Sequence, residues 1–220
     1  MNKEWIFFDV GGTLTDESFF TQWRAKNNLE IAQKYLPDLI EKDVWNVWER
    51  ASSMKGGLDD NILSILLDDT HKTQEAIQEL NDRKSKAPSY TDTQIIRPEA
   101  RTVVKALSAK YKLGLIANQS QAINLKLEEA GVLQYFSYKN VSGHVGYTKP
   151  DPEYFKAVFK ESGAKPATSV MVDDNIERGL LPAKSFGMET VWFKVREREI
   201  PEQGVDKVIT SLSELIDLFL

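Results

Sequence analysis

The amino-acid sequence predicts an α/β fold: a Rossmann-like, doubly wound parallel sheet core with an inserted α-helical cap domain. Three observations predict it. Short apolar runs stop abruptly at polar residues, as strands buried on both faces of a parallel sheet do. Helical patterns alternate with these runs along most of the chain. One long stretch near the N-terminus breaks the alternation and carries only helical patterns.

The expected strands are short and rich in aromatic and branched side chains. The first, Trp5-Ile6-Phe7-Phe8, is wholly apolar and ends at Asp9. Two more runs behave in the same way, and two weaker candidates follow toward the C-terminus. The expected strands are residues 5–8, 113–117, 169–172, 190–193 and 208–209. The helices expected between them are residues 99–110, which open after Pro98, residues 121–130, which close at Gly131, and residues 152–162, which close at Gly163.

The segment of residues 17–90 contains no convincing strand. Its apolar residues recur at helical spacing, as around Trp45 and Trp48, and its end is polar and contains a proline, as a linker does. We therefore expect a helical cap at residues 17–90, inserted into a core formed by residues 1–16 and 91–220. A helical insertion cannot join the sheet, so we expect it over the strand ends, where open α/β sheets bind ligands.

The composition argues against several function classes. The chain has 220 residues, 28 Lys and Arg against 33 Asp and Glu, and a net charge of −5 at pH 7. This acidic balance argues against a broad electrostatic contact with nucleic acid. The absence of cysteine excludes disulfides, thiolate metal sites and thiol nucleophiles. No apolar run approaches the roughly 18 residues that span a bilayer. We expect a cytoplasmic protein that binds neither nucleic acid nor a membrane. We expect it to be a monomer or a homodimer.

Carboxylate and amide side chains follow three of the expected strands. They are Asp9, Asn118 and the adjacent pair Asp173 and Asp174. Because the carboxyl ends of parallel strands lie at one edge of the sheet, these groups should share one crevice. Clustered carboxylates repel one another unless a cation lies among them. Oxygen ligands without His or Cys suit Mg²⁺. The sequence therefore predicts a Mg²⁺ site at this edge.

Two further features predict that the same edge binds a phosphoryl group. The loop Gly11-Gly12-Thr13 supplies backbone N–H groups and a hydroxyl that can surround phosphate. Lys149, just before the expected helix at residues 152–162, can add a point charge. A carboxylate nucleophile, Mg²⁺ and a lysine together favour phosphoryl transfer through an aspartyl-phosphate.

Four motifs resemble, in order and spacing, those of the haloacid dehalogenase superfamily, in the branch with a helical cap inserted after the first motif. They are FDVGGTLTD at residues 8–16, which resembles DxDGTLxD, LIAN at 115–118, VGYTKPDPEYF at 145–155, and VMVDD at 170–174 followed by PAK at 182–184. Together they cover most of the chain. The resemblance implies a hydrolase, and first of all a Mg²⁺-dependent phosphatase that acts on a small phosphorylated metabolite.

The resemblance also implies a role for each motif residue. Asp9 would be the nucleophile, and Lys149 would hold Asp9 and neutralise the phosphoryl group. The implied metal ligands are the carboxylates of Asp9, Asp173 and Asp174 and the carbonyl of Gly11. The choice between Asp173 and Asp174 as primary ligand stays open. The residues expected to contact the substrate are Gly12, Thr13, Asn118 and Gln119.

Two positions depart from the family pattern. Phosphatases of the family carry a second Asp two residues after the nucleophile as general acid and base, where this sequence has Gly11. Such a proton relay is typically worth about 10²–10⁴-fold in rate. The second motif normally offers Ser or Thr to a phosphoryl oxygen, where this sequence has Ala117 followed by Asn118.

These departures leave two alternative functions. One is a hydrolase similar to the family's 2-haloacid dehalogenases or phosphonate-cleaving enzymes, acting on a small halogenated or phosphonate substrate. The other is a catalytically degenerate protein that binds a ligand or a partner.

Overall fold

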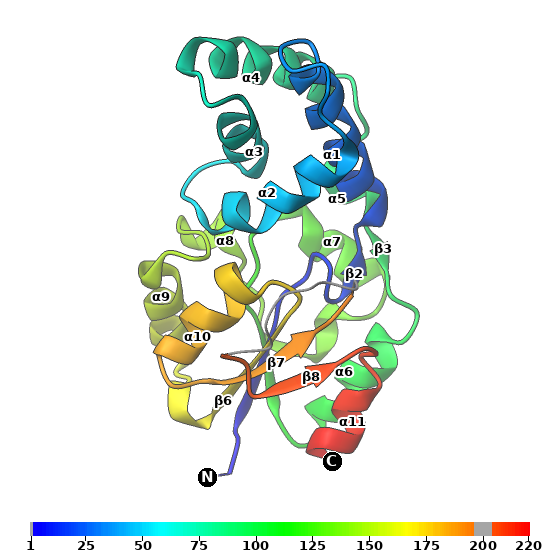
Figure 1. The fold of residues 1–220 in the computed structure, drawn as a ribbon. Helices are drawn as coiled ribbons and strands as arrows, with labels where there is room; N and C mark the ends of the chain where they lie inside the picture. Colours follow the sequence, from blue (N-terminus) through cyan, green and yellow to red (C-terminus); the bar gives the residue numbers. More distant parts are fainter. Residues whose placement is uncertain (1, 196–203) are drawn as a thin grey trace. The chain divides into compact units, whose positions relative to one another are not determined.

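The computed structural model describes residues 2–195 and 204–220. The chain divides into two compact units, one formed by Met1–Asp16 with Ile95–Leu220 and the other by Glu17–Gln94. Figure 1 shows the elements of both units along the chain. Among the described residues, no helix is both long enough and apolar enough to cross a lipid bilayer.

The first unit is built on a six-stranded parallel sheet with the strand order β5-β4-β1-β6-β7-β8. Its strands are β1 (Trp5–Phe8), β4 (Lys112–Leu115), β5 (Phe136–Tyr138), β6 (Ser169–Asp173), β7 (Glu189–Phe193) and β8 (Lys207–Ile209). All four residues of β1 are buried, as expected for a central strand of a parallel sheet. The predicted α/β class is therefore confirmed.

The register of the central strands aligns their carboxyl ends. Phe8, the last residue of β1, pairs with Leu115 of β4 and with Val172 of β6. The next residues, Asp9 and Asp173, therefore lie side by side at one edge of the sheet. This is the edge at which the sequence predicts the chemistry.

Helices cover both faces of this sheet (Figure 1). Successive side chains of a strand point to opposite faces, so Ile6 and Phe8 belong to one buried cluster and Trp5 and Phe7 to the other. The first cluster includes residues of α6 (Ala100–Ser108), α7 (Ala122–Glu129) and α11 (Glu214–Phe219), and the second includes residues of α9 (Pro152–Ser162) and α10 (Leu181–Ser185). The doubly wound arrangement is confirmed.

The ends of α9 follow the signals in the sequence. Asp151 caps the helix by accepting a hydrogen bond from the Glu153 N–H at 2.9 Å, and Pro152 occupies its first turn. Gly163 ends it in the left-handed conformation, with φ 71°. This helix therefore has the predicted bounds. Helices α6 and α7 are one or two residues shorter at each end than predicted, where helix ends commonly fray.

One strand of the sheet, β5, was not predicted. Phe136 and Tyr138 are buried but Ser137 between them is exposed, so the segment forms no apolar run. Several other elements are too short to produce a periodic pattern. They are β2 (Thr15–Asp16), β3 (Ile95–Ile96), α8 (Ser142–Val145), the 3₁₀ turns Leu133–Tyr135 and Pro166–Thr168, and the π-helical turn Ile176–Leu180. Strands β2 and β3 pair antiparallel where the chain leaves and re-enters the first unit.

The second unit consists of helices, and its described residues include no strand. The helices are α1 (Ser18–Ala32), α2 (Glu41–Ser53), α3 (Leu58–Leu67), α4 (Thr70–Lys84) and α5 (Tyr90–Thr93). Their apolar faces form two buried clusters. One contains Ile31, Leu63 and Leu80, and the other contains Val44, Trp48 and Ile62.

The second unit ends slightly later than the sequence predicts. The sequence predicts a return to the core at residue 91, whereas Ser89 accepts a hydrogen bond from the Asp92 N–H and starts the short helix α5 there. The chain re-enters the first unit at Ile95. Residues 1 and 196–203, which were assigned to the core, lie outside the described residues.

Candidate active site

Asp9 lies at the carboxyl end of the central strand β1. Its N–H donates a hydrogen bond to the Val172 carbonyl at 2.9 Å, which continues the β1–β6 ladder by one residue. The residue is 7% exposed, so its carboxylate is largely removed from solvent. The sheet therefore fixes the backbone of Asp9 and leaves its side chain at the strand ends.

Lys149 joins the first and fourth motifs. Its Nζ lies 2.9 Å from Asp9 Oδ1 and 2.6 Å from Asp173 Oδ2. Lys149 is 4% exposed and Asp173 is fully buried. Ion pairs in such a position are screened little by solvent, and each partner depends on the other for compensation of its charge.

The side chain of Asn118 binds the backbone of Lys149. Its Oδ1 accepts a hydrogen bond from the Lys149 N–H at 2.7 Å, and its Nδ2 donates to the Lys149 carbonyl at 2.9 Å. From the second motif we expect Asn118 to contact the substrate. In the structure its side-chain amide is engaged at both ends with the backbone of Lys149, so it positions that lysine.

The electrostatic balance of the site is acidic. Burial by itself would lower the pKa of Lys149, but the carboxylates of Asp173 and Asp9 more than offset this and raise it above its ordinary value. Burial raises the pKa of Asp173 to about 7; the Asp9 carboxylate adds to the shift and Lys149 opposes it. One ammonium thus lies between two carboxylates. A second cation would balance their charge when both are ionised.

Three carboxylates could hold that cation. Asp9, Asp173 and Asp174 each offer an oxygen, and these oxygens lie within 4.8 Å of one another. Trp192 donates its Nε1–H to the Asp174 carbonyl at 3.1 Å and so fixes the backbone of that residue. A set of oxygens with excess negative charge is the donor chemistry that Mg²⁺ requires. The residues present therefore fit this ion.

The loop after Asp9 approaches the same carboxylates. Gly12 has φ +78°, and a Cβ at this position would lie 2.5 Å from Asp174 Oδ2. Only glycine combines this backbone conformation with such a close approach. Gly11 forms a bridge with Thr15, the first residue of β2, across the turn at residues 12–14. Thr13 is fully buried, and its hydroxyl has no hydrogen-bond partner among the described residues.

Gln119, also expected at the substrate, lies beside α8. Its N–H donates to Ser142 Oγ at 3.0 Å, and the same hydroxyl donates back to the Gln119 carbonyl at 3.2 Å. Residue 119 is 6% exposed. Gln119 directly follows Asn118 in the chain, and these two hydrogen bonds fix its backbone to Ser142, the first residue of α8.

Two residues that shape the site were not singled out from the sequence. The Tyr154 hydroxyl donates to the Ala117 carbonyl at 3.0 Å and accepts from the Ala117 N–H at 3.1 Å, which joins α9 to the chain after β4. Gly179, in the π-helical turn, passes so close to Asp173 that a Cβ there would lie 2.0 Å from Asp173 Oδ2. The only sequence signal for Gly179 was its position between the two parts of the fourth motif, residues 170–174 and 182–184.

Gly179→Ala is expected to lower the free energy of unfolding by about 1–3 kcal/mol, the cost of overpacking a filled interior. In an ordinary helix this change is stabilising, because alanine favours helix over glycine. Here the added methyl group displaces either the turn or the Asp173 carboxylate. Chemical denaturation checks the effect. The matched control is Gly163→Ala, where a Cβ meets nothing within 4 Å and only the left-handed conformation, φ +71°, is strained. A Gly179→Ala protein more stable than wild type contradicts the expectation.

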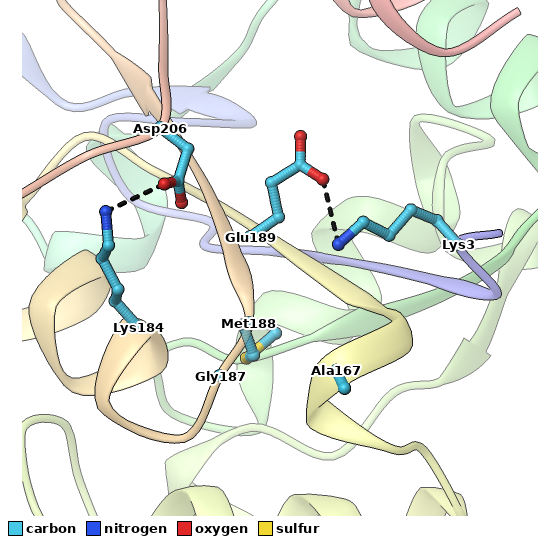
Figure 2. A pocket seen from close by; sticks show the side chains of 7 residues that line it. All are labelled: Lys3, Ala167, Lys184, Gly187, Met188, Glu189 and Asp206. Carbon is cyan, nitrogen blue, oxygen red and sulfur yellow. Dashed lines mark hydrogen bonds and ion pairs between the residues drawn. The ribbon is translucent and has the colours of Figure 1, made fainter. Parts of the chain in front are cut away.

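A separate surface pocket of about 540 Å³ lies at the other end of the strands (Figure 2). It is lined by Lys3, Ala167, Lys184, Gly187, Met188, Glu189 and Asp206. Lys3 precedes β1 and Glu189 begins β7, so these residues are at the amino ends of the strands. The four charged side chains form two ion pairs, Lys3 with Glu189 at 2.9 Å and Lys184 with Asp206 at 2.8 Å. Among the described residues that line the pocket, every charged side chain is paired with one of opposite sign.

Comparison with known proteins shows the family to which this chain belongs. Residues 3–187 match the family model of haloacid dehalogenase-like hydrolases. The chain belongs to this family. The predicted membership is thereby confirmed, and the protein is a hydrolase with the Rossmann-like fold of the family.

Several relatives of this haloacid dehalogenase-like hydrolase match along nearly its whole length. Pyrimidine 5'-nucleotidase YjjG of Escherichia coli (strain K12) is 28% identical over 237 residues, which cover 99% of this chain and 98% of the relative. A glyceraldehyde 3-phosphate phosphatase of Pyrococcus furiosus is 24% identical and covers 97% of this chain and 91% of the relative. A crystal structure of a HAD phosphatase from Thermococcus onnurineus has the same fold, with a TM-score of 0.62, 23% identity and coverage of 99% and 97%.

Proposed function

We propose that this hydrolase is a Mg²⁺-dependent phosphatase that acts on a small phosphorylated metabolite through an aspartyl-phosphate on Asp9. The observation that carries the proposal is the position of Lys149 Nζ between Asp9 Oδ1 and Asp173 Oδ2, at 2.9 and 2.6 Å. A carboxylate able to act as a nucleophile thus lies beside a cation and a cluster of oxygens that could bind a metal ion. The phosphatase names of the relatives agree with this reaction class.

Each residue of the site has a part in this reaction. A carboxylate oxygen of Asp9 attacks phosphorus, the bond to the ester oxygen breaks, and water then releases the phosphate from Asp9. Lys149 holds the Asp9 carboxylate in place and offsets the charge of the phosphoryl oxygens. Gly12 and Thr13 lie in the loop that surrounds these oxygens, where the buried hydroxyl of Thr13 can serve as a donor.

The carboxylates of Asp9, Asp173 and Asp174, together with the carbonyl of Gly11, would hold Mg²⁺. When bound, the ion would neutralise negative charge on the phosphoryl group. The helical unit of residues 17–94 is proposed to act as the cap that selects the substrate and excludes water. A cytoplasmic location and a monomeric or homodimeric state stay predictions.

The test is phosphate release from a panel of sugar phosphates, nucleotides and p-nitrophenyl phosphate. Each substrate is assayed with Mg²⁺ and with EDTA. The proposal expects turnover of at least one substrate with Mg²⁺ and its loss on chelation. Failure to release phosphate from any of them contradicts it.

A second candidate is cleavage of a carbon–halogen bond, and the observation that favours it is Gly11 in place of the second Asp. The discriminating assay is halide release from 2-haloacids. Release that persists in EDTA supports this candidate, and its absence removes it. A protein that shows neither activity but binds inorganic phosphate is the degenerate member that the sequence also allows.

Gly11→Asp is expected to raise the phosphatase kcat by about 10²–10⁴-fold, because it restores a group able to protonate the leaving oxygen. The change is measured with p-nitrophenyl phosphate and with a poorer leaving group such as a sugar phosphate. The larger gain is expected for the poorer leaving group, which needs the proton more. Gly11→Asn is the matched control, since it adds similar volume without a titratable group. Equal rates for both variants contradict the prediction.

A further inference from the structure

We propose, on the basis of the proposed function, that Arg97 is a positioning residue for the phosphoryl-binding loop. Its guanidinium contacts two consecutive carbonyls of that loop. Nη2 donates to the Gly12 carbonyl and Nε donates to the Thr13 carbonyl, each at 3.0 Å. The backbone N–H of Arg97 donates to the next carbonyl, that of Leu14, also at 3.0 Å. One residue thus holds three carbonyls in succession.

These contacts fix the orientation of the peptide groups. A trans peptide unit is planar, and its N–H points opposite to its carbonyl. A guanidinium on the Gly12 and Thr13 carbonyls therefore turns the N–H groups of Thr13 and Leu14 away from Arg97. It also polarises both peptide units, which strengthens their N–H groups as donors. The Thr13 N–H donates to the Val10 carbonyl at 3.2 Å and closes the turn.

Arg97 is itself held in place. Its guanidinium carbon lies 4.9 Å from the centre of the Phe193 ring, at the end of β7, and Phe193 is 2% exposed. Arg97 directly follows β3, which pairs with β2 through Ile95 and Asp16. Arg97 is half-buried, so its hydrogen bonds are partly shielded from water. A guanidinium has the planar fork to reach two carbonyls at once, whereas a lysine ammonium carries a single point charge.

The experiment compares Arg97→Lys, Arg97→Met and wild type. With p-nitrophenyl phosphate and Mg²⁺, we expect kcat/KM to fall about 10-fold in Arg97→Lys and about 100-fold in Arg97→Met, since small misplacements at a reacting centre cost about 10²-fold. The inhibition constant of orthovanadate should rise by a similar factor. Partial unfolding alone would lower kcat and leave KM and the vanadate constant unchanged. Arg101→Lys, at an exposed arginine of α6, is the control.

Hydrogen exchange provides a readout without turnover. The amides of residues 10–16 should exchange faster in both Arg97 variants, while those of α9 keep the wild-type rate. If an Arg97 variant fails to fold, Phe193→Leu replaces it, because this change removes the aromatic ring and leaves the arginine. Wild-type exchange at residues 10–16 together with an unchanged vanadate constant overturns the proposal. Absence of turnover in the wild type overturns the proposed function instead, and the exchange result still decides the role of Arg97.

Discussion

Asp9→Asn is expected to abolish turnover, with kcat reduced by on the order of 10³–10⁶-fold, the range seen when a catalytic nucleophile is removed. The amide has the shape of the carboxylate but is a far weaker nucleophile. Phosphate release with p-nitrophenyl phosphate and Mg²⁺ measures the loss. The fold should persist, because the Asp9 backbone is held by its hydrogen bond to Val172.

The Asp9→Asn variant is also expected to be at least as stable as wild type. Asp9 is one of three clustered carboxylates, and two of them, Asp9 and Asp173, form ion pairs with Lys149. Removal of one negative charge relieves their repulsion, so the melting temperature without Mg²⁺ should equal or exceed that of wild type. Asp69→Asn is the matched control, since asparagine is as good a helix cap as aspartate. A variant that keeps more than a small fraction of wild-type activity would mean that the nucleophile is another group.

Lys149→Met is expected to lower both activity and stability. The ammonium is the partner of Asp9 and Asp173, and its loss leaves buried carboxylates without compensation. Removal of one partner of a buried pair typically costs about 3–5 kcal/mol. The loss of a charge beside the phosphoryl group should reduce kcat by about 10²–10³-fold, as for other preorganised electrostatic contacts.

Added Mg²⁺ should restore part of the stability of Lys149→Met, because the ion provides the missing positive charge. Denaturation with and without Mg²⁺ measures both parts of this prediction. Lys156→Met, which removes an exposed lysine paired with Glu153, is the control and should change neither property appreciably. A Lys149→Met protein as stable as wild type without Mg²⁺ would show that the buried pairs do not hold the site together.

The sequence predicts the positions of the acidic residues because a parallel sheet leaves little freedom there. An apolar run followed at once by a polar residue marks a strand end, and central strands in register bring such ends together. Phe8 pairs with Val172, so the neighbouring positions of Asp9 and Asp173 follow from the strand pattern. The bounds of α9 were equally readable, because Asp151 and Gly163 are specific helix signals.

Other features could not be predicted, because they depend on contacts between distant parts of the chain. Arg97 lies more than eighty positions from the carbonyls it holds, at sequence separations of 84 and 85. Nothing in its local sequence points to a loop after β1. Asn118 was expected at the substrate, and only the fold shows its amide on the backbone of Lys149. The close approach of Gly179 to Asp173 is likewise a property of packing.

The glycine at position 11 remains the strongest departure from the family's phosphatase pattern. It removes a proton donor but leaves Asp9, Lys149 and the acidic cluster in place. A site of this kind should still form the covalent intermediate with a good leaving group, because such a group needs little protonation. Formation of the intermediate is therefore a more direct test than the rate of turnover.

The decisive measurement is the trapping of phosphorylated Asp9. The protein is mixed with p-nitrophenyl phosphate and Mg²⁺, quenched in acid, digested and analysed by mass spectrometry. We expect the peptide containing Asp9 to gain the mass of one phosphoryl group in wild type, and to gain none in Asp9→Asn or in EDTA. Phosphate release without this modification, or modification of a different peptide, would contradict it.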